Sequence, residues 1–198
     1  MAHMSRAMRF FSRAPVLCAA LAAIPVQADE IRPMFKVGAD FGGDKLATAT
    51  FSNGQVQDIR ANDGFFIGGG ASILNDQRDL EAEISLTVKV DSIKASNGEL
   101  VWSRTPIDAL FFHRIPGARV GGGLTYHLGP ELKGSGAAGN IFTKFDNALG
   151  VIAQGDYSIS EQHQLGLRYT RLTYKTRGVT PQASAKSNGL GLVFSMRF

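Results

Sequence analysis

The sequence contains a single cysteine, Cys18, among 198 residues. One thiol cannot form an internal disulfide, so cross-links do not stabilise the fold. Long apolar runs are also missing: the stretch Pro15–Ile24 is too short to cross a bilayer as a helix, which needs about 20 apolar residues. The 23 glycines argue against an all-helical chain, because an interior glycine costs a helix roughly 1 kcal/mol.

Residues 1–28 have the three parts of a secretory signal peptide in order. Three arginines precede the apolar stretch Pro15–Ile24, and a small-residue cleavage site ends at Ala28. We therefore predict a signal peptide at 1–28 and a single domain at 29–198; a short membrane anchor is the alternative. Removing 1–28 leaves 18 basic and 17 acidic residues, a net charge of +1. This small net charge gives little support for nucleic-acid binding, which needs a clustered basic face.

Beyond Ala28 we find no helical periodicity, and apolar and polar residues alternate in eight segments instead. The segments are 35–41, 65–73, 80–91, 107–112, 119–126, 149–158, 165–170 and 189–198. Short connections follow the second, fourth and sixth segments, and longer ones follow the first, third, fifth and seventh. Short turns at one end and long loops at the other are typical of outer-membrane barrels. The sequence thus predicts an all-β, eight-stranded antiparallel up-and-down transmembrane β-barrel.

A secreted β-sandwich or a lipocalin-like barrel also has alternating strands and is the main alternative. The aromatic residues of the apolar face lie near the strand ends, where a bilayer interface favours them. We predict membrane aromatic belts made of Phe35, Phe41, Phe65, Phe111, Tyr126, Tyr157, Tyr169 and Phe198. Because a sheet in hydrocarbon must close on itself, we expect the last segment to pair with the first.

The opposite face of the segments carries charges of both signs, which can pair inside a barrel. We predict a polar network in the lumen made of Lys36, Asp40, Glu81, Glu83, Lys89, Asp108, Arg119, Asp156, Arg168 and Arg197. The inward glycines are expected to make room for large neighbours such as Arg119 and Arg168. An eight-stranded barrel has an interior that side chains can fill.

Three stretches carry a resemblance to a known family: "VLCAALAAIPVQA", "QLGLRYTRLTY" at 164–174 and the terminal "GLGLVFSMRF". From about residue 33 to 198, the layout resembles the small outer-membrane β-barrel superfamily that includes OmpA transmembrane domains, OmpX and related porin-like proteins. The terminal stretch is similar to the signal read by the outer-membrane assembly machinery, which implies that role for Gly191, Phe194 and Phe198. The resemblance implies export to the outer membrane of a Gram-negative bacterium, with membrane lipid and lipopolysaccharide as neighbours.

Signals for catalysis and cofactors are weak. No H-x-S motif follows Ala28, although Ser103, His113 and Asp108 are a nucleophile, a base and an orienting acid that could meet in space. The two "GGG" runs lack the lysine and hydroxyl of a phosphate-binding loop. Paired histidine spacing is also missing, so we expect no metal, no cofactor and no enzymatic activity.

These observations favour a non-enzymatic barrel that supports envelope integrity and presents its outer loops to a host or surface ligand. A narrow OmpW-like channel for small apolar solutes is the second hypothesis, and a lipid-A-modifying enzyme is the third. Pro106 removes a ladder donor near Trp102 and Arg104, which predicts a local bulge or, alternatively, a lateral opening.

Overall fold

The computed structural model describes residues 30–51, 54–95, 97–136 and 141–198, so the predicted signal peptide lies outside the described residues. Within these ranges, no helix is long and apolar enough to cross a bilayer. The strands are β1 (Glu30–Gly42), β2 (Lys45–Thr50), β3 (Val56–Arg60), β4 (Gly64–Leu74), β5 (Leu80–Ala95), β6 (Gly98–Ile115), β7 (Ala118–Gly136), β8 (Phe142–Lys144), β9 (Ala148–Ser158), β10 (His163–Lys175), β11 (Ser184–Lys186) and β12 (Gly189–Arg197).

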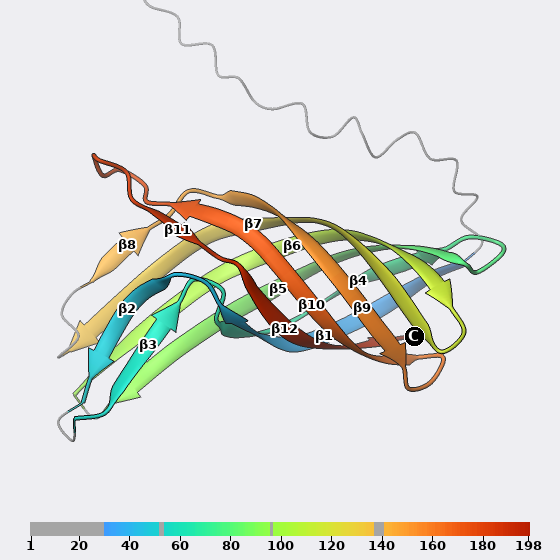
Figure 1. The fold of residues 1–198 in the computed structure, drawn as a ribbon, viewed down its shortest axis with the longest axis horizontal. Coiled ribbons are helices and arrows are strands. Elements are labelled where there is room, and N and C mark those ends of the chain that lie inside the picture. The colour runs from blue at the N-terminus through green and yellow to red at the C-terminus, as the bar shows by residue number, and fades with distance from the viewer. Residues whose placement is uncertain (1–29, 52–53, 96, 137–140) are drawn as a thin grey trace, which may run out of the picture.

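Eight of these strands form a closed antiparallel ring in the order β1, β4, β5, β6, β7, β9, β10, β12 (Figure 1). The ring closes where β12 pairs with β1, in a register that runs from Met34 opposite Arg197 to Gly42 opposite Gly189. Closure gives every strand two neighbours, which satisfies the backbone donors and acceptors that hydrocarbon cannot solvate. The predicted eight-stranded antiparallel barrel is confirmed.

The remaining strands extend the barrel at its long-loop end. β2 and β3 form a hairpin with Thr50 opposite Val56, and β5 and β6 stay paired up to Ala95 and Gly98. β8 pairs with the distal part of β7, and β11 pairs with the distal part of β10. The wall of the cylinder therefore continues beyond the eight-stranded ring at this end (Figure 1).

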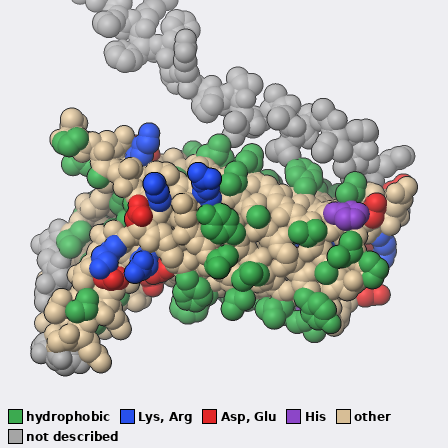
Figure 2. All heavy atoms as spheres, in the orientation of Figure 1, with side chains coloured by type: hydrophobic (Ala, Val, Ile, Leu, Met, Phe, Trp, Pro, Cys, Tyr) green, Lys and Arg blue, Asp and Glu red, His purple; other side chains and the backbone are tan. Residues whose placement is uncertain are grey.

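Side chains alternate between the two faces of the ring. Leu86, Val151 and Leu192 are 53%, 51% and 55% exposed, whereas their sequence neighbours point inward and are buried. Apolar side chains are spread over the outside of the cylinder, and charged ones gather toward its ends (Figure 2). An apolar exterior around a polar interior is the inverse of a soluble fold and requires lipid on the outside.

The strand ladders are irregular around Pro106. On one side, pairing with β5 runs to Leu86 opposite Ile107 and resumes at Lys89 opposite Arg104. On the other side, the register with β7 shifts between Ser103 and Thr105. Between these pairs β7 has two residues, Gly129 and Pro130, where β6 has one, Arg104. The predicted local bulge is therefore present near Pro106, but its extra residue is on β7.

Inward glycines leave room for carboxylates as well as for larger groups. A Cβ atom on Gly166 would lie 1.7 Å from Oδ1 of Asp156, and one on Gly191 would lie 1.7 Å from Oδ1 of Asp40. A Cβ atom on Gly38 would meet the ring of Phe66. The expectation that the inward glycines make room for large neighbours is confirmed at Gly38 and is wrong at Gly166 and Gly191, where the neighbour is a carboxylate.

We predict that a methyl group at Gly121 destabilises the barrel. A Cβ atom there would lie 1.9 Å from the backbone oxygen of Phe111, so β6 and β7 would have to separate. Overpacking of this kind typically costs about 1–3 kcal/mol. Gly121→Ala should lower the midpoint of urea unfolding in detergent micelles, followed by boil-sensitive gel migration. The matched control is Gly155→Ala, because nothing lies within 4 Å of that Cβ position; equal effects of the two changes would contradict the prediction.

Candidate functional site

Arg119 is the centre of a buried ion network in the half of the barrel nearest the short turns. Its guanidinium donates to Glu81 at 2.6 Å, to Glu83 at 2.9 Å and to Asp156 at 2.6 Å. The same group stacks on the ring of Phe112, with Cζ 3.8 Å from the centroid. All three nitrogens of the guanidinium donate to carboxylates, so the position of this cation is fixed from three directions.

Further cations complete this network. Lys36 donates to Glu83, and Arg197 lies 3.3 Å from Glu81. The side-chain amide of Gln154 donates to Asp156 at 2.9 Å. Each carboxylate of this network therefore has at least one cation beside it.

A second network lies closer to the long loops. Arg168 donates to Asp108 at 3.2 Å, and the hydroxyl of Thr125 donates to the same carboxylate at 2.6 Å. Lys89 donates to Asp40 at 2.5 Å, and Nε of Arg168 lies 3.8 Å from Asp40. Asp40 thus links the two cations of this network.

All ten residues of the predicted lumen network are buried inside the ring and belong to one of these two networks. Five are cations and five are anions: Lys36, Lys89, Arg119, Arg168 and Arg197 against Asp40, Glu81, Glu83, Asp108 and Asp156. The charges of the two sets cancel, which is the condition under which buried ions are tolerated.

Above the second network, the interior becomes aromatic. Trp102 packs edge-on against Phe145 at 5.3 Å and against Tyr174 at 5.2 Å between ring centroids. The hydroxyl of Tyr174 lies 2.5 Å from Nδ1 of His127. Burial raises the pKa of the Tyr174 phenol, so it remains protonated at neutral pH. Trp102, Phe145 and Tyr174 belong to an apolar cluster that also includes Leu132 and Leu172.

The segment between β3 and β4 is inserted into this end of the barrel. Trp102 donates to the carbonyl of Ala61 at 3.1 Å, and Arg104 donates to the carbonyl of Asn62 at 3.0 Å. The guanidinium of Arg104 also lies 5.0 Å from the Trp102 ring centroid. Ile59, Ala61 and Asn62 are fully buried. Residues 59–62 therefore cover the ion networks from the side of the long loops.

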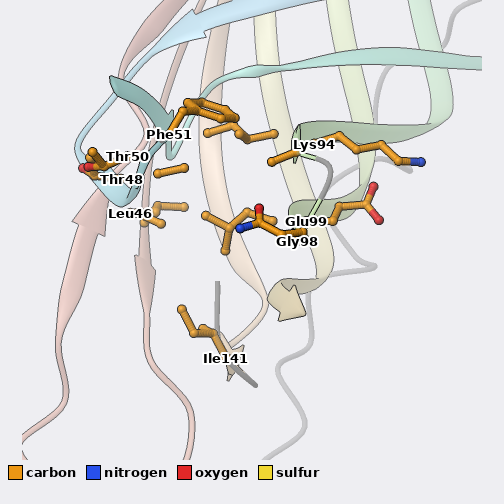
Figure 3. Close-up of a pocket in the computed structure, with 14 residues that line it drawn as sticks. Leu46, Thr48, Thr50, Phe51, Lys94, Gly98, Glu99 and Ile141 are labelled. Atoms are coloured by element: carbon orange, nitrogen blue, oxygen red, sulfur yellow. The ribbon is translucent and has the colours of Figure 1, made fainter. Parts of the chain in front are cut away.

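A pocket of about 700 Å³ lies outside this cover, between the β2–β3 hairpin and the distal ends of β5 and β6. Leu46, Thr48, Thr50 and Phe51 lie on one side of it, and Lys94, Gly98 and Glu99 on the other (Figure 3). Ile93 and Leu100 line the pocket and also belong to the apolar cluster below. The volume is within the range of about 300–1,000 Å³ that is typical of small-molecule sites.

An ion pair braces the hairpin beside the pocket. Nζ of Lys45 lies 2.9 Å from Asp58, and the hydroxyl of Thr48 donates to the same carboxylate at 2.7 Å. The hydrogen bond from Lys45 holds the pKa of Asp58 below its usual range, and the bond from Thr48 acts in the same direction. The depressed pKa means that the bracing is present at neutral pH and is lost as the pH falls through the folded-state pKa.

The residues predicted to form the aromatic belts lie on the outer face. Seven are exposed, namely Phe41, Phe65, Phe111, Tyr126, Tyr157, Tyr169 and Phe198, and Phe35 is half-buried. Phe41 and Tyr169 flank Leu190 in the strand ladders, so these three side chains form one row near the long loops. Their role as membrane belts stays a prediction, as does the assembly role of Gly191, Phe194 and Phe198.

The predicted catalytic alternative fails on geometry. Ser103, His113 and Asp108 all lie on β6, and only Asp108 points inward. Ten residues of strand separate Ser103 from His113 by about 33 Å, so the three groups cannot meet. Among the residues that the structure describes, no group of three or more histidine, aspartate or glutamate side chains is arranged to hold a metal.

Several interior residues were missed from the sequence. Arg104, His127 and Tyr174 continue the inward alternation of their strands beyond the predicted segments, so extending the period-two pattern would have found them. The buried segment 59–62 had no such signal, because its position depends on contacts with Trp102 and Arg104 from another strand.

The closed ring, the apolar exterior and the ion-paired networks of the interior define an eight-stranded transmembrane β-barrel. Neither a protein-family model nor a curated protein sequence matches the chain. Among solved structures, the chain is similar to Ail, the attachment invasion locus protein of Yersinia pestis, crystallised with the heparin analogue sucrose octasulfate. The TM-score is 0.51 at 9% identity, over 85% of this chain and 97% of Ail.

Two further barrels are similar to the chain at lower scores. Neisserial surface protein A has a TM-score of 0.46 at 14% identity, over 85% of this chain and 97% of its own. The outer-membrane protein AlkL has a TM-score of 0.44 at 12% identity, over 98% and 97% of the two chains. At these identities, the likeness to solved structures concerns the fold alone.

We predict that removing the Arg119 cation is costly. Arg119→Met would leave Glu81, Glu83 and Asp156 buried beside one another with too few cations, and breaking a buried ion network typically costs about 3–5 kcal/mol. The free energy of unfolding can be followed by the fluorescence of Trp102, the single tryptophan of the chain.

The control for this experiment is Lys133→Met. Lys133 pairs with Glu131 at the surface at 2.5 Å, and such exposed pairs are worth at most about 1 kcal/mol. A loss for Arg119→Met no larger than that of the control would show that the buried network does not stabilise the barrel.

Proposed function

We propose that this chain is a non-enzymatic outer-membrane barrel with a closed interior, which contributes to envelope integrity and acts through its long-loop end. The observation that carries the proposal is the occupied interior. Two ion networks fill successive levels of the ring, and residues 59–62 cover them from the loop side. A barrel whose interior is filled in this way contacts ligands through its outer surface and its long-loop end.

The apolar exterior supports the membrane location in this proposal, because exposed leucine, valine and isoleucine side chains surround the middle of the cylinder. Its immediate partners would be outer-membrane lipid and lipopolysaccharide, the assembly machinery during insertion, and a host or surface ligand at the loops. A lipid-A-modifying activity remains the third hypothesis. Mass spectrometry of lipid A from cells with and without the protein distinguishes it, since an unchanged lipid A is expected.

We predict that the refolded protein forms no long-lived channel in a planar lipid bilayer. The interior side chains are held by ion pairs on several strands, so opening a path would require breaking many of them together. Single-channel recordings in 1 M KCl check this, with a general porin inserted by the same procedure as the positive control. A stable open state with reproducible conductance would overturn the closed-interior proposal.

The passage or binding of small apolar solutes is a second candidate, favoured by a different observation. The interior is polar in the ring but apolar at the long-loop end, where Leu46 and Phe51 of the hairpin pack on the buried cluster beside the 700 Å³ pocket. The lining of the pocket is mixed, with Leu46, Phe51 and Leu100 beside polar side chains. Its apolar part suits the hydrocarbon portion of a ligand, because burial of that portion removes apolar surface from water.

We predict that a diazirine-bearing decane, applied to the protein in nanodiscs, labels residues of this pocket after photolysis. Leu46→Asp places a charge in the lining and should reduce pocket labelling several-fold, while labelling of the lipid-facing surface stays unchanged as an internal reference. Val56→Asp is the control, because Val56 is on the same hairpin, is exposed and does not line the pocket. No labelling of the pocket in the unaltered protein would remove this candidate.

A further inference from the structure

Basic side chains gather on one side of the long-loop end. Arg171, Lys175 and Lys186 are exposed, and Lys186 is opposite Thr173, the residue midway between the other two on β10. We call these three residues the basic face. The backbone NH of Lys186, in β11, donates to the carboxylate of Asp44 at 2.8 Å. This contact brings Lys45, the residue after Asp44, and its ladder partner Arg60 close to the basic face. Lys and Arg side chains cluster in this region of the surface (Figure 2).

The cations of the basic face are available for a ligand. Arg171, Lys175 and Lys186 form no ion pair with another of the described residues. Basic residues on the opposite side of the same end differ: Lys133 pairs with Glu131, and Lys94 is opposite Glu99 in the ladder. Three cations without an ion partner among the described residues are therefore grouped over β10 and β11. At the start of the β2–β3 hairpin, Lys45 pairs with Asp58, and Asp44 accepts from the backbone NH of Lys186.

The height of the basic face indicates which anionic molecule fits it. Arg171 is the next outward residue after Tyr169, the exposed aromatic side chain in the row with Leu190 and Phe41. From Tyr169 to Lys175 the strand rises about 20 Å, or about 15 Å along the barrel axis at the usual tilt. The headgroup layer of a phospholipid is only about 5–8 Å thick on each side of the bilayer. The charges thus extend well beyond the phosphates of ordinary phospholipids.

We propose that the basic face binds a phosphorylated glycolipid of the outer leaflet, whose anionic groups continue outward from the lipid anchor into its sugar core. Arg171 lies at the level of phosphates next to the acyl chains, and Lys186 and Lys175 reach the phosphates or carboxylates of the sugars. The apolar row of Tyr169, Leu190 and Phe41 lies beside the acyl chains of the same molecule. This site rests on the membrane location proposed above and does not depend on whether the interior conducts.

The test compares two triple variants with the same change in charge. Arg171→Gln/Lys175→Gln/Lys186→Gln removes the basic face, and Lys94→Gln/Lys133→Gln/Lys144→Gln removes three exposed lysines elsewhere at the same end. Each protein is placed in nanodiscs containing rough-type lipopolysaccharide with a phosphorylated core, and bound glycolipid is counted by native mass spectrometry. Boil-sensitive migration verifies that each variant is folded. The basic-face variant should bind the glycolipid about tenfold or more weakly, and the control should bind like the unaltered protein.

Two results would overturn the proposal. Equal losses in both variants would show that only net charge matters, and effective competition by phosphatidylglycerol would assign the face to ordinary anionic phospholipid. Binding that weakens after enzymatic removal of the glycolipid phosphates would support it, as would weakening at high salt, since exposed charges are screened. Conductance recorded on the same preparations separates failure of this site from failure of the closed-interior proposal.

Discussion

Closure of the sheet is the constraint on which the rest of this structure depends. In hydrocarbon an unpaired backbone group costs several kcal/mol, so no strand of the membrane-spanning region can be left as an edge. The pairing of β12 with β1 meets that requirement and joins the two ends of the described chain in one ladder. Once the ring is closed, alternation along each strand sends one set of side chains to lipid and the other to a narrow interior.

That narrow interior explains why the charges are paired so completely. The two networks contain five cations and five anions, and Arg119 alone contacts three carboxylates from two other strands. An ion left alone in this environment would be expensive, whereas a neutral network whose members donate and accept to one another is tolerated. Gly166 and Gly191 are part of the same arrangement, because the carboxylates of Asp156 and Asp40 occupy the space that a side chain there would need.

The long-loop end has a different chemistry from the ring. There the wall is extended by β8, β11 and the β2–β3 hairpin, and the interior contains Trp102, Phe145 and Tyr174 in place of ion pairs. Arg104 joins the two regions, because it stacks on Trp102 and donates to the carbonyl of Asn62. The outside of this end carries both a pocket with a mixed lining and a group of basic side chains, so two kinds of ligand contact lie at the same end of the barrel.

The sequence by itself determined the fold class, the number of strands in the ring and the face on which the ten charged residues of the predicted network lie, because a period of two leaves only two choices for each side chain. Tertiary structure decided which charges meet: Arg119 and Glu81 are 38 residues apart and come together only through the register of the closed ring. It also decided the position of Ala61 and Asn62 after β3, whose carbonyls are held by hydrogen bonds from Trp102 and Arg104. Alternation is a property of one strand, whereas partners across a barrel depend on strand order, register and tilt together.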